Sequence, residues 1–105
     1  MMAVSGQTLS KIQSLAKLYQ TGYRSQTVDT TIDKLVEMER SQLEAEASSL
    51  ALELNAFESQ YGIASADFYR QFRTGEAGDE ADMFDWSATY QMWLSVQDRL
   101  ETVRS

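Results

Sequence analysis

The longest stretch of this chain without a helix breaker lies between Gly22 and Gly62, because the chain contains no proline and no glycine falls inside it. Apolar residues recur there mostly at three- and four-residue spacings: Val28, Ile32, Leu35, Val36, Leu43, Ala47, Leu50, Leu54, Phe57 and Tyr61. This period predicts one long helix over residues 26–61. Its apolar stripe requires cover from another helix of this chain or of a second copy.

Shorter helical patterns flank the long one. They predict helices over 8–21, 65–73 and 83–104, with an acidic loop over 74–82. No strand pattern or internal repeat is present, and 105 residues suit a single domain, 1–105. We therefore predict an all-α fold, in which a long projecting amphipathic helix packs with the short helix and the C-terminal helix as a helical hairpin or coiled-coil-like bundle.

Capping residues support these boundaries. The expected N-caps are Thr8 or Ser10, Ser25 or Thr27, Ser65, and Asp79 or Asp82. Gly22 is expected at the C′ position of the first helix, and Thr74-Gly75 is expected to end the third.

The chain has no cysteine and no histidine. This excludes disulfides, thiolate zinc sites and every nucleophile–base pair built on cysteine or histidine. Nucleophile elbows, phosphate-binding loops and dinucleotide fingerprints are also absent. We therefore expect no enzyme activity, no catalytic residue and no cofactor. No apolar h-region opens the sequence and no apolar run approaches the ~18 residues of a membrane span, so we expect a cytoplasmic protein that binds no membrane.

The net charge of −7 is unevenly distributed. Residues 1–40 carry five bases and four acids, whereas residues 41–105 carry four bases and twelve acids. The acidic part disfavours general nucleic-acid binding and would speed the encounter with a basic partner. Solubility alone is the simpler explanation of the same charge.

The segment FRTGEAGDEADMFDW, residues 72–86, carries five acids and two glycines. Its acids could supply oxygen ligands to calcium or magnesium, but the spacing does not match an EF-hand, so we expect no metal site. A turn shaped by Gly75 and Gly78 that enters a capped helix fits the residues better. Such a turn also sets a negative rim beside the aromatic residues that follow.

An aromatic stripe continues into the last helix through Phe84, Trp86, Tyr90 and Trp93. At helical spacing most of such a stripe is expected to lie in the core of its own fold. Aromatic residues are also enriched at the energetic centres of interfaces. We expect one or two of these residues to contact a partner, together with some of Phe68, Tyr69 and Phe72.

The segment LYQTGYRSQTVDTTIDKL, residues 18–35, resembles the turn between the two helices of ribbon-helix-helix proteins in Gly22, Tyr23, Arg24 and Ser25. That family reads DNA with a strand placed just before its first helix. Here the corresponding residues, MMAVSGQ, contain no base and little alternation, and the apolar positions after the turn lie about one place off register. DNA therefore remains a minor candidate partner.

The segment from Glu58 to Trp93 is similar to the C-terminal half of small antitoxin-like proteins of prokaryotic type II toxin–antitoxin modules. The matching pattern is tyrosine-glycine, a phenylalanine-tyrosine pair and F-x-x-G-E-x-G-D-x-x-D-x-x-x-W, carried by Tyr61, Gly62, Phe68, Tyr69, Phe72, Gly75, Glu76, Gly78, Asp79, Asp82 and Trp86. Residues 18–35 agree loosely with the N-terminal part of the same proteins. The resemblance implies a non-catalytic protein that binds and masks a small basic toxin.

The sequence thus predicts an antitoxin that forms a homodimer. The expected partner-binding residues are Phe68, Tyr69, Phe72, Glu76, Asp79, Glu80, Asp82, Trp86, Tyr90 and Trp93, and the expected dimerisation residues are Leu43, Leu50, Leu54 and Phe57. A helical scaffold or adaptor, whose apolar stripes serve only self-assembly, is the alternative. A metal-dependent enzyme that uses the acidic loop is a third and weaker hypothesis.

Overall fold

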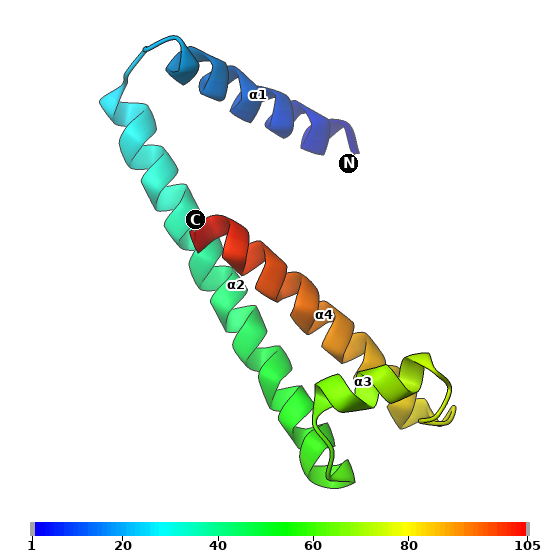
Figure 1. The fold of residues 1–105 in the computed structure, drawn as a ribbon. Helices are drawn as coiled ribbons and strands as arrows, with labels where there is room; N and C mark the ends of the chain where they lie inside the picture. The colour runs from blue at the N-terminus through cyan, green and yellow to red at the C-terminus, as the bar shows by residue number, and fades with distance from the viewer. Residues whose placement is uncertain (1, 105) are drawn as a thin grey trace. The chain divides into compact units, whose positions relative to one another are not determined.

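The computed structural model of the chain describes the backbone of residues 2–104 and the side chains of residues 6–104. Residues 2–104 form four helices and no strand (Figure 1): α1 (Met2–Gln20), α2 (Gln26–Tyr61), α3 (Ser65–Arg73) and α4 (Ala81–Arg104). The predicted all-α class is confirmed. Within residues 2–104, no helix combines the length and the apolar character that a membrane crossing requires.

The bounds of α2 and α3 are those that the sequence predicts. Helix α1 begins at Met2 rather than at residue 8, since the residues before Thr8 include no proline to stop it. Helix α4 begins at Ala81, two residues earlier than predicted.

The chain divides into two compact units where the sequence suggested one domain. The N-terminal unit comprises the described residues up to Leu35, which are α1 and the first turns of α2. The C-terminal unit comprises the described residues from Val36 onward, which are the rest of α2 with α3 and α4.

In the C-terminal unit, α4 packs antiparallel to α2 (Figure 1). One core cluster joins Ala47 and Leu50 of α2 to Val96 and Leu100 of α4. Val96 and Leu100 are each only 2% exposed. Because apolar residues at helical spacing on both partners face each other, the pair forms the predicted helical hairpin.

A second core cluster lies where α3 joins the hairpin. It contains Leu54 of α2, Phe68 of α3, and Met83 and Trp86 of α4. Helix α3 thus covers the end of the hairpin formed by the last turns of α2 and the first turns of α4.

This packing corrects the predicted dimerisation surface. Leu50 and Leu54 are buried core residues, while Leu43 and Phe57 pack against the same two clusters. Since α4 and α3 of the same chain cover this part of the α2 stripe, Leu50 and Leu54 are not available to a second copy in this conformation, and Leu43 and Phe57 are half-buried against the same clusters.

The turn between α1 and α2 has the hydrogen bonds of a Schellman motif. The amide of Tyr23 donates to the Leu18 carbonyl, and the amide of Gly22 donates to the Tyr19 carbonyl. Gly22 has φ +97°, a conformation that costs a residue with a side chain about 1–2 kcal/mol. The Ser25 hydroxyl accepts the Val28 amide at 3.3 Å and caps α2. Both the predicted glycine stop and the predicted serine cap are confirmed.

The start of α3 differs from its predicted cap. The N-cap is Ala64, whose methyl group cannot accept a hydrogen bond. The Ser65 amide donates instead to the Glu58 carboxylate at 2.8 Å. A negative charge at a helix start is favourable, so the end of α2 stabilises the start of α3. Helix α3 ends in a second Schellman motif at Gly75, where the predicted Thr74-Gly75 stop is found.

Candidate interaction surfaces

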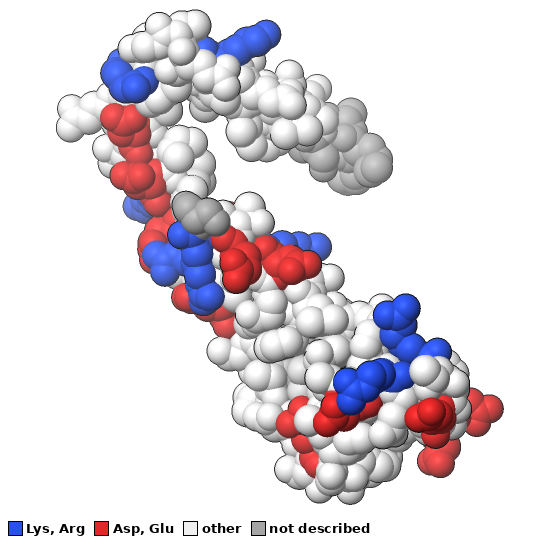
Figure 2. Space-filling model, in the orientation of Figure 1, with Lys and Arg blue, Asp and Glu red and all other residues white. Residues whose placement is uncertain are grey.

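The α3–α4 loop and the first turns of α4 carry five carboxylates. Figure 2 shows acidic residues gathered at this end of the C-terminal unit. Four of them, Glu76, Asp79, Glu80 and Asp85, are exposed, and Asp82 is half-buried. None of the five forms an ion pair with a base among residues 6–104, whose ion pairs are Glu37–Arg40, Asp67–Arg70 and Glu44–Arg104. Unpaired charge of one sign attracts a partner of the other sign.

Asp82 has a structural partner within the chain. The Tyr61 hydroxyl donates to its carboxylate at 2.6 Å and so joins the last turn of α2 to the first turn of α4. This hydrogen bond holds the phenol in its neutral form and, with desolvation and the nearby charge of Glu80, raises the pKa of Tyr61 to about 12. The N-cap position of α4 is occupied by Glu80, since the amide of Met83 donates to the Glu80 carbonyl. The predicted caps, Asp79 and Asp82, do not hold this position.

Trp86 lies at the centre of an aromatic core. Its indole stacks on the Phe68 ring with a centroid distance of 3.8 Å and an interplanar angle of 1°. The rings of Phe57 and Tyr61 stack on it at 5.4 and 5.6 Å. Trp86 is 1% exposed and Phe68 is 2% exposed. These two predicted partner-binding residues are therefore corrected to core residues, because three helices meet around them.

The other four predicted aromatic contact residues, Tyr69, Phe72, Tyr90 and Trp93, are half-buried. Tyr69 packs on Tyr90 at 5.2 Å, and Tyr90 stacks on Trp93 at 6.0 Å. Tyr90 and Trp93 also line a shallow groove of about 280 Å³ together with Asn55 and Glu58 of α2. These residues support the core with one side and leave the other side accessible.

Phe84 is the more exposed of two exposed aromatic residues at the acidic end, the other being Tyr61; it belongs to the predicted aromatic stripe but not to the expected partner-binding residues. It is 55% exposed, and its ring meets the edge of Phe72 in a T-shaped contact at 5.4 Å. Asp82 and Asp85 flank it in the sequence. Phe84 follows the buried Met83 by one position, so its side chain points away from the buried stripe of α4. This position in the helical pattern is the sequence signal that could have marked Phe84 as exposed.

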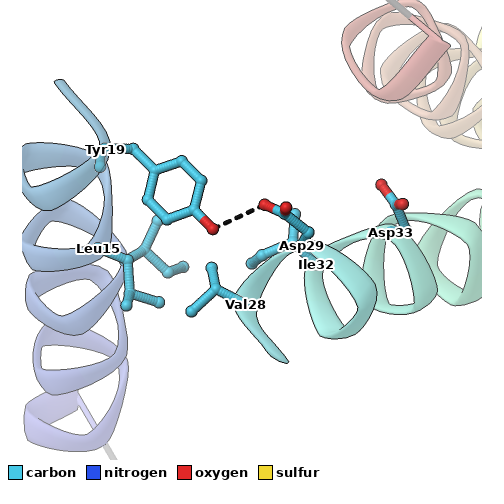
Figure 3. A pocket seen from close by; sticks show the side chains of 8 residues that line it. Leu15, Tyr19, Val28, Asp29, Ile32 and Asp33 are labelled. Atoms are coloured by element: carbon cyan, nitrogen blue, oxygen red, sulfur yellow. Dashed lines mark hydrogen bonds between the residues drawn. The ribbon is translucent and has the colours of Figure 1, made fainter. Parts of the chain in front are cut away.

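The N-terminal unit contains an apolar groove between α1 and the first turns of α2 (Figure 3). The groove has a volume of about 560 Å³ and is lined by Ile12, Leu15, Ala16, Tyr19, Val28 and Ile32. Asp29 and Asp33 add carboxylates to its α2 side. An apolar groove with charges at its margin is the form that binding sites for amphipathic helices take.

Tyr19 fixes the geometry of this unit. Its hydroxyl donates to the Asp29 carboxylate at 2.6 Å and accepts the Ser25 amide at 3.1 Å. The hydrogen bond to Asp29 raises the pKa of Tyr19. Arg24 lies over the Tyr19 ring at 5.1 Å and donates to the backbone carbonyls of Tyr19 and Tyr23. These contacts tie α1 to the start of α2.

Residues 2–7 belong to α1, at the position where ribbon-helix-helix proteins place their DNA-reading strand. The N-terminal unit therefore provides no strand of the kind that this family uses to read DNA. Within residues 6–104, no three acidic side chains gather closely enough to form a metal-binding group.

Comparison of the chain with protein-family models, with curated proteins and with solved structures finds no match. The resemblance to antitoxin-like proteins remains a prediction that depends on the residues quoted for it.

Proposed function

We propose that this chain is a non-catalytic binding protein that masks a small basic protein, and that it acts as the antitoxin of a toxin–antitoxin pair. One observation carries the proposal. The α3–α4 loop and the first turns of α4 carry exposed carboxylates without an ion-pair partner among residues 6–104, and the exposed Phe84 lies in the same segment, beside Asp85 in the sequence.

The two kinds of residue have separate tasks in the proposed complex. Glu76, Asp79 and Glu80 raise the rate of encounter with a basic protein, since they lie on an exposed loop and attract it over several ångströms. Phe84 supplies apolar area that loses its water when the partner docks. Its edge contact with Phe72 holds the ring in place before binding, which lowers the entropy cost of association.

The core behind this surface is rigid enough to present it. The stacked Phe68 and Trp86 rings lie under the first turns of α4, and the Tyr61–Asp82 hydrogen bond holds the start of that helix against α2. A partner therefore meets a preformed first part of α4.

The test is capture from lysate of the source cells at moderate salt, with the mass of each eluted protein determined. The bait is the full chain, and the matched baits are Phe84→Ala and Met92→Ala, because Met92 is similarly exposed on α4. The proposal expects one small basic protein in stoichiometric amount on the wild type and on Met92→Ala, and much less on Phe84→Ala. Absence of such a protein, or equal capture by Phe84→Ala, would refute it.

A self-assembling helical scaffold is the second candidate. The observation that favours it is the set of exposed apolar residues on the N-terminal unit, among them Leu9, Ile12 and Leu35 at 56%, 55% and 50% exposure. A scaffold would bind copies of itself in the same capture experiment and no basic protein.

A further inference from the structure

The N-terminal unit carries apolar side chains at helical spacing on both of its helical segments, but none of those among the described residues is buried. None of residues 6–35 is buried, whereas every buried apolar residue among residues 6–104 lies between Ala47 and Leu100. Leu15, Tyr19 and Val28 reach only partial burial in the groove between α1 and α2. An obligate interface resembles a domain core cut in half, and this unit has that character.

Charge in this unit is partly separated between its two helical segments: α1 is basic, whereas the first turns of α2 carry two acids and Lys34. Helix α1 carries Lys11 and Lys17 and no acid among residues 2–20. The first turns of α2 carry Asp29 and Asp33, which both line the groove, as Figure 3 shows. The apolar groove is therefore acidic at its margin, and the helix beside it is apolar and basic.

We propose that a second copy of this chain occupies the groove, with α1 of each copy packed reciprocally against the groove of the other. In a two-fold interface the same patch faces itself, so each feature must find its complement within one chain. The acidic groove and the basic, apolar α1 satisfy that condition.

The size of the unit suits such an interface. A standard stable interface buries about 800 Å² per partner and uses about 20–30 residues a side. The exposed apolar side chains Leu9, Ile12, Leu18, Ile32 and Leu35 lie within the described part of the N-terminal unit. The interface would use residues other than the Leu43–Phe57 stripe, which α4 and α3 already cover. It also uses none of the residues proposed above to mask a basic protein.

The first experiment is sedimentation equilibrium of the full chain without any added partner, over a concentration series. Wild type is compared with Ile12→Asp in the groove and with Leu52→Asp, a matched control on α2 whose side chain is 72% exposed. We expect a dimer for wild type and for Leu52→Asp. We expect the dissociation constant of Ile12→Asp to rise by about a hundredfold, because the new charge loses water without gaining a partner.

The second experiment separates an interface from a folding defect by exchanging charges. One variant is Lys11→Glu with Lys17→Glu, and the other is Asp33→Lys, which spares the Asp29 carboxylate that Tyr19 bonds. Each variant alone places like charges across the proposed interface, so its dimer is expected to weaken by about tenfold at low salt. An equimolar mixture of the two restores opposite charges at both contacts and is expected to form a heterodimer at about the wild-type affinity.

A monomeric wild-type chain would overturn the proposal. A dimer that Ile12→Asp leaves unchanged, or charge variants that fail to associate when mixed, would overturn it as well. Since no basic protein is added, these outcomes are independent of whether the α3–α4 end masks one.

Discussion

The indole Nε1 of Trp86 donates a 2.9 Å hydrogen bond to Oγ of Ser65. The most buried ring of α4 is thereby joined to the first residue of α3, whose hydroxyl is 21 positions earlier in the chain. The same serine donates its amide to Glu58 of α2. One residue thus links all three helices of the C-terminal unit, and it does so in place of the capping role that its sequence position suggests.

Ser65→Ala is expected to lower the free energy of unfolding by about 1–3 kcal/mol, because the buried indole N–H loses its acceptor. Urea unfolding followed by far-UV circular dichroism measures the change. Ser95→Ala, an exposed serine of α4, is the control and is expected to change stability by less than about 0.5 kcal/mol. Equal stability of Ser65→Ala and wild type would contradict the proposed role of this hydrogen bond.

The Tyr61–Asp82 contact predicts a loss of stability in alkali. Folding raises the pKa of Tyr61 to about 12 from about 10, so the unfolded chain releases this proton first as the pH rises. The stabilisation from Tyr61 is complete below about pH 10 and disappears as the pH approaches 12. The urea midpoint of wild type should therefore fall more steeply over this range than that of Tyr61→Phe. Parallel curves for the two proteins would show that the contact does not form in solution.

Phe84 and Trp93 are expected to respond differently to truncation. Phe84→Ala should weaken binding of the captured basic protein by more than about 1 kcal/mol and leave the melting temperature of the free chain nearly unchanged. Trp93→Ala should lower the stability of the free chain by about 2 kcal/mol or more, because Trp93 packs against both core clusters. Titration calorimetry and thermal unfolding measure the two effects. If Trp93→Ala instead weakened binding and Phe84→Ala instead lowered stability, Trp93 rather than Phe84 would be the contact residue.

The loop acids should act mainly on the rate of association. The triple variant Glu76→Gln, Asp79→Asn, Glu80→Gln is expected to slow association about tenfold at low salt and much less at high salt. Its control removes the same charge from exposed acids elsewhere in the unit: Glu46→Gln, Glu53→Gln and Asp98→Asn. Surface plasmon resonance at two ionic strengths gives both rates. If the two triple variants slow association equally, net charge rather than the loop is responsible.

Local signals in the sequence predicted the bounds of α2 and α3, but not the first residues of α1 and α4. Gly22 and Ser25 define the turn between α1 and α2 because each forms a hydrogen bond with a backbone group three residues away. The Gly22 amide donates to the Tyr19 carbonyl, and the Ser25 hydroxyl accepts from the Val28 amide. The sequence offers Asp79 or Asp82 as the cap of α4, whereas Glu80 holds the N-cap position, and long-range contact with Tyr61 decides the role of Asp82.

Helical spacing did not predict which parts of a stripe the chain covers. The α2 stripe continues from Val28 to Tyr61 in the sequence, yet α4 packs only on the part after residue 42. The length of α4 and the α3–α4 turn set that limit, and neither is encoded in the α2 pattern. For the same reason Trp86 and Phe68 could be read as contact residues, although α3 and α4 bury them against each other.

The most direct test of the proposed masking surface is hydrogen–deuterium exchange of the chain alone and in complex with the captured basic protein. The amides of residues 77–80 lie outside the regular helices and beyond the turn hydrogen bonds of residues 74–76, so new protection there is readily detected. The account predicts strong additional protection of residues 74–86 in the complex. Unchanged exchange across these residues, with protection elsewhere in the chain, would contradict it.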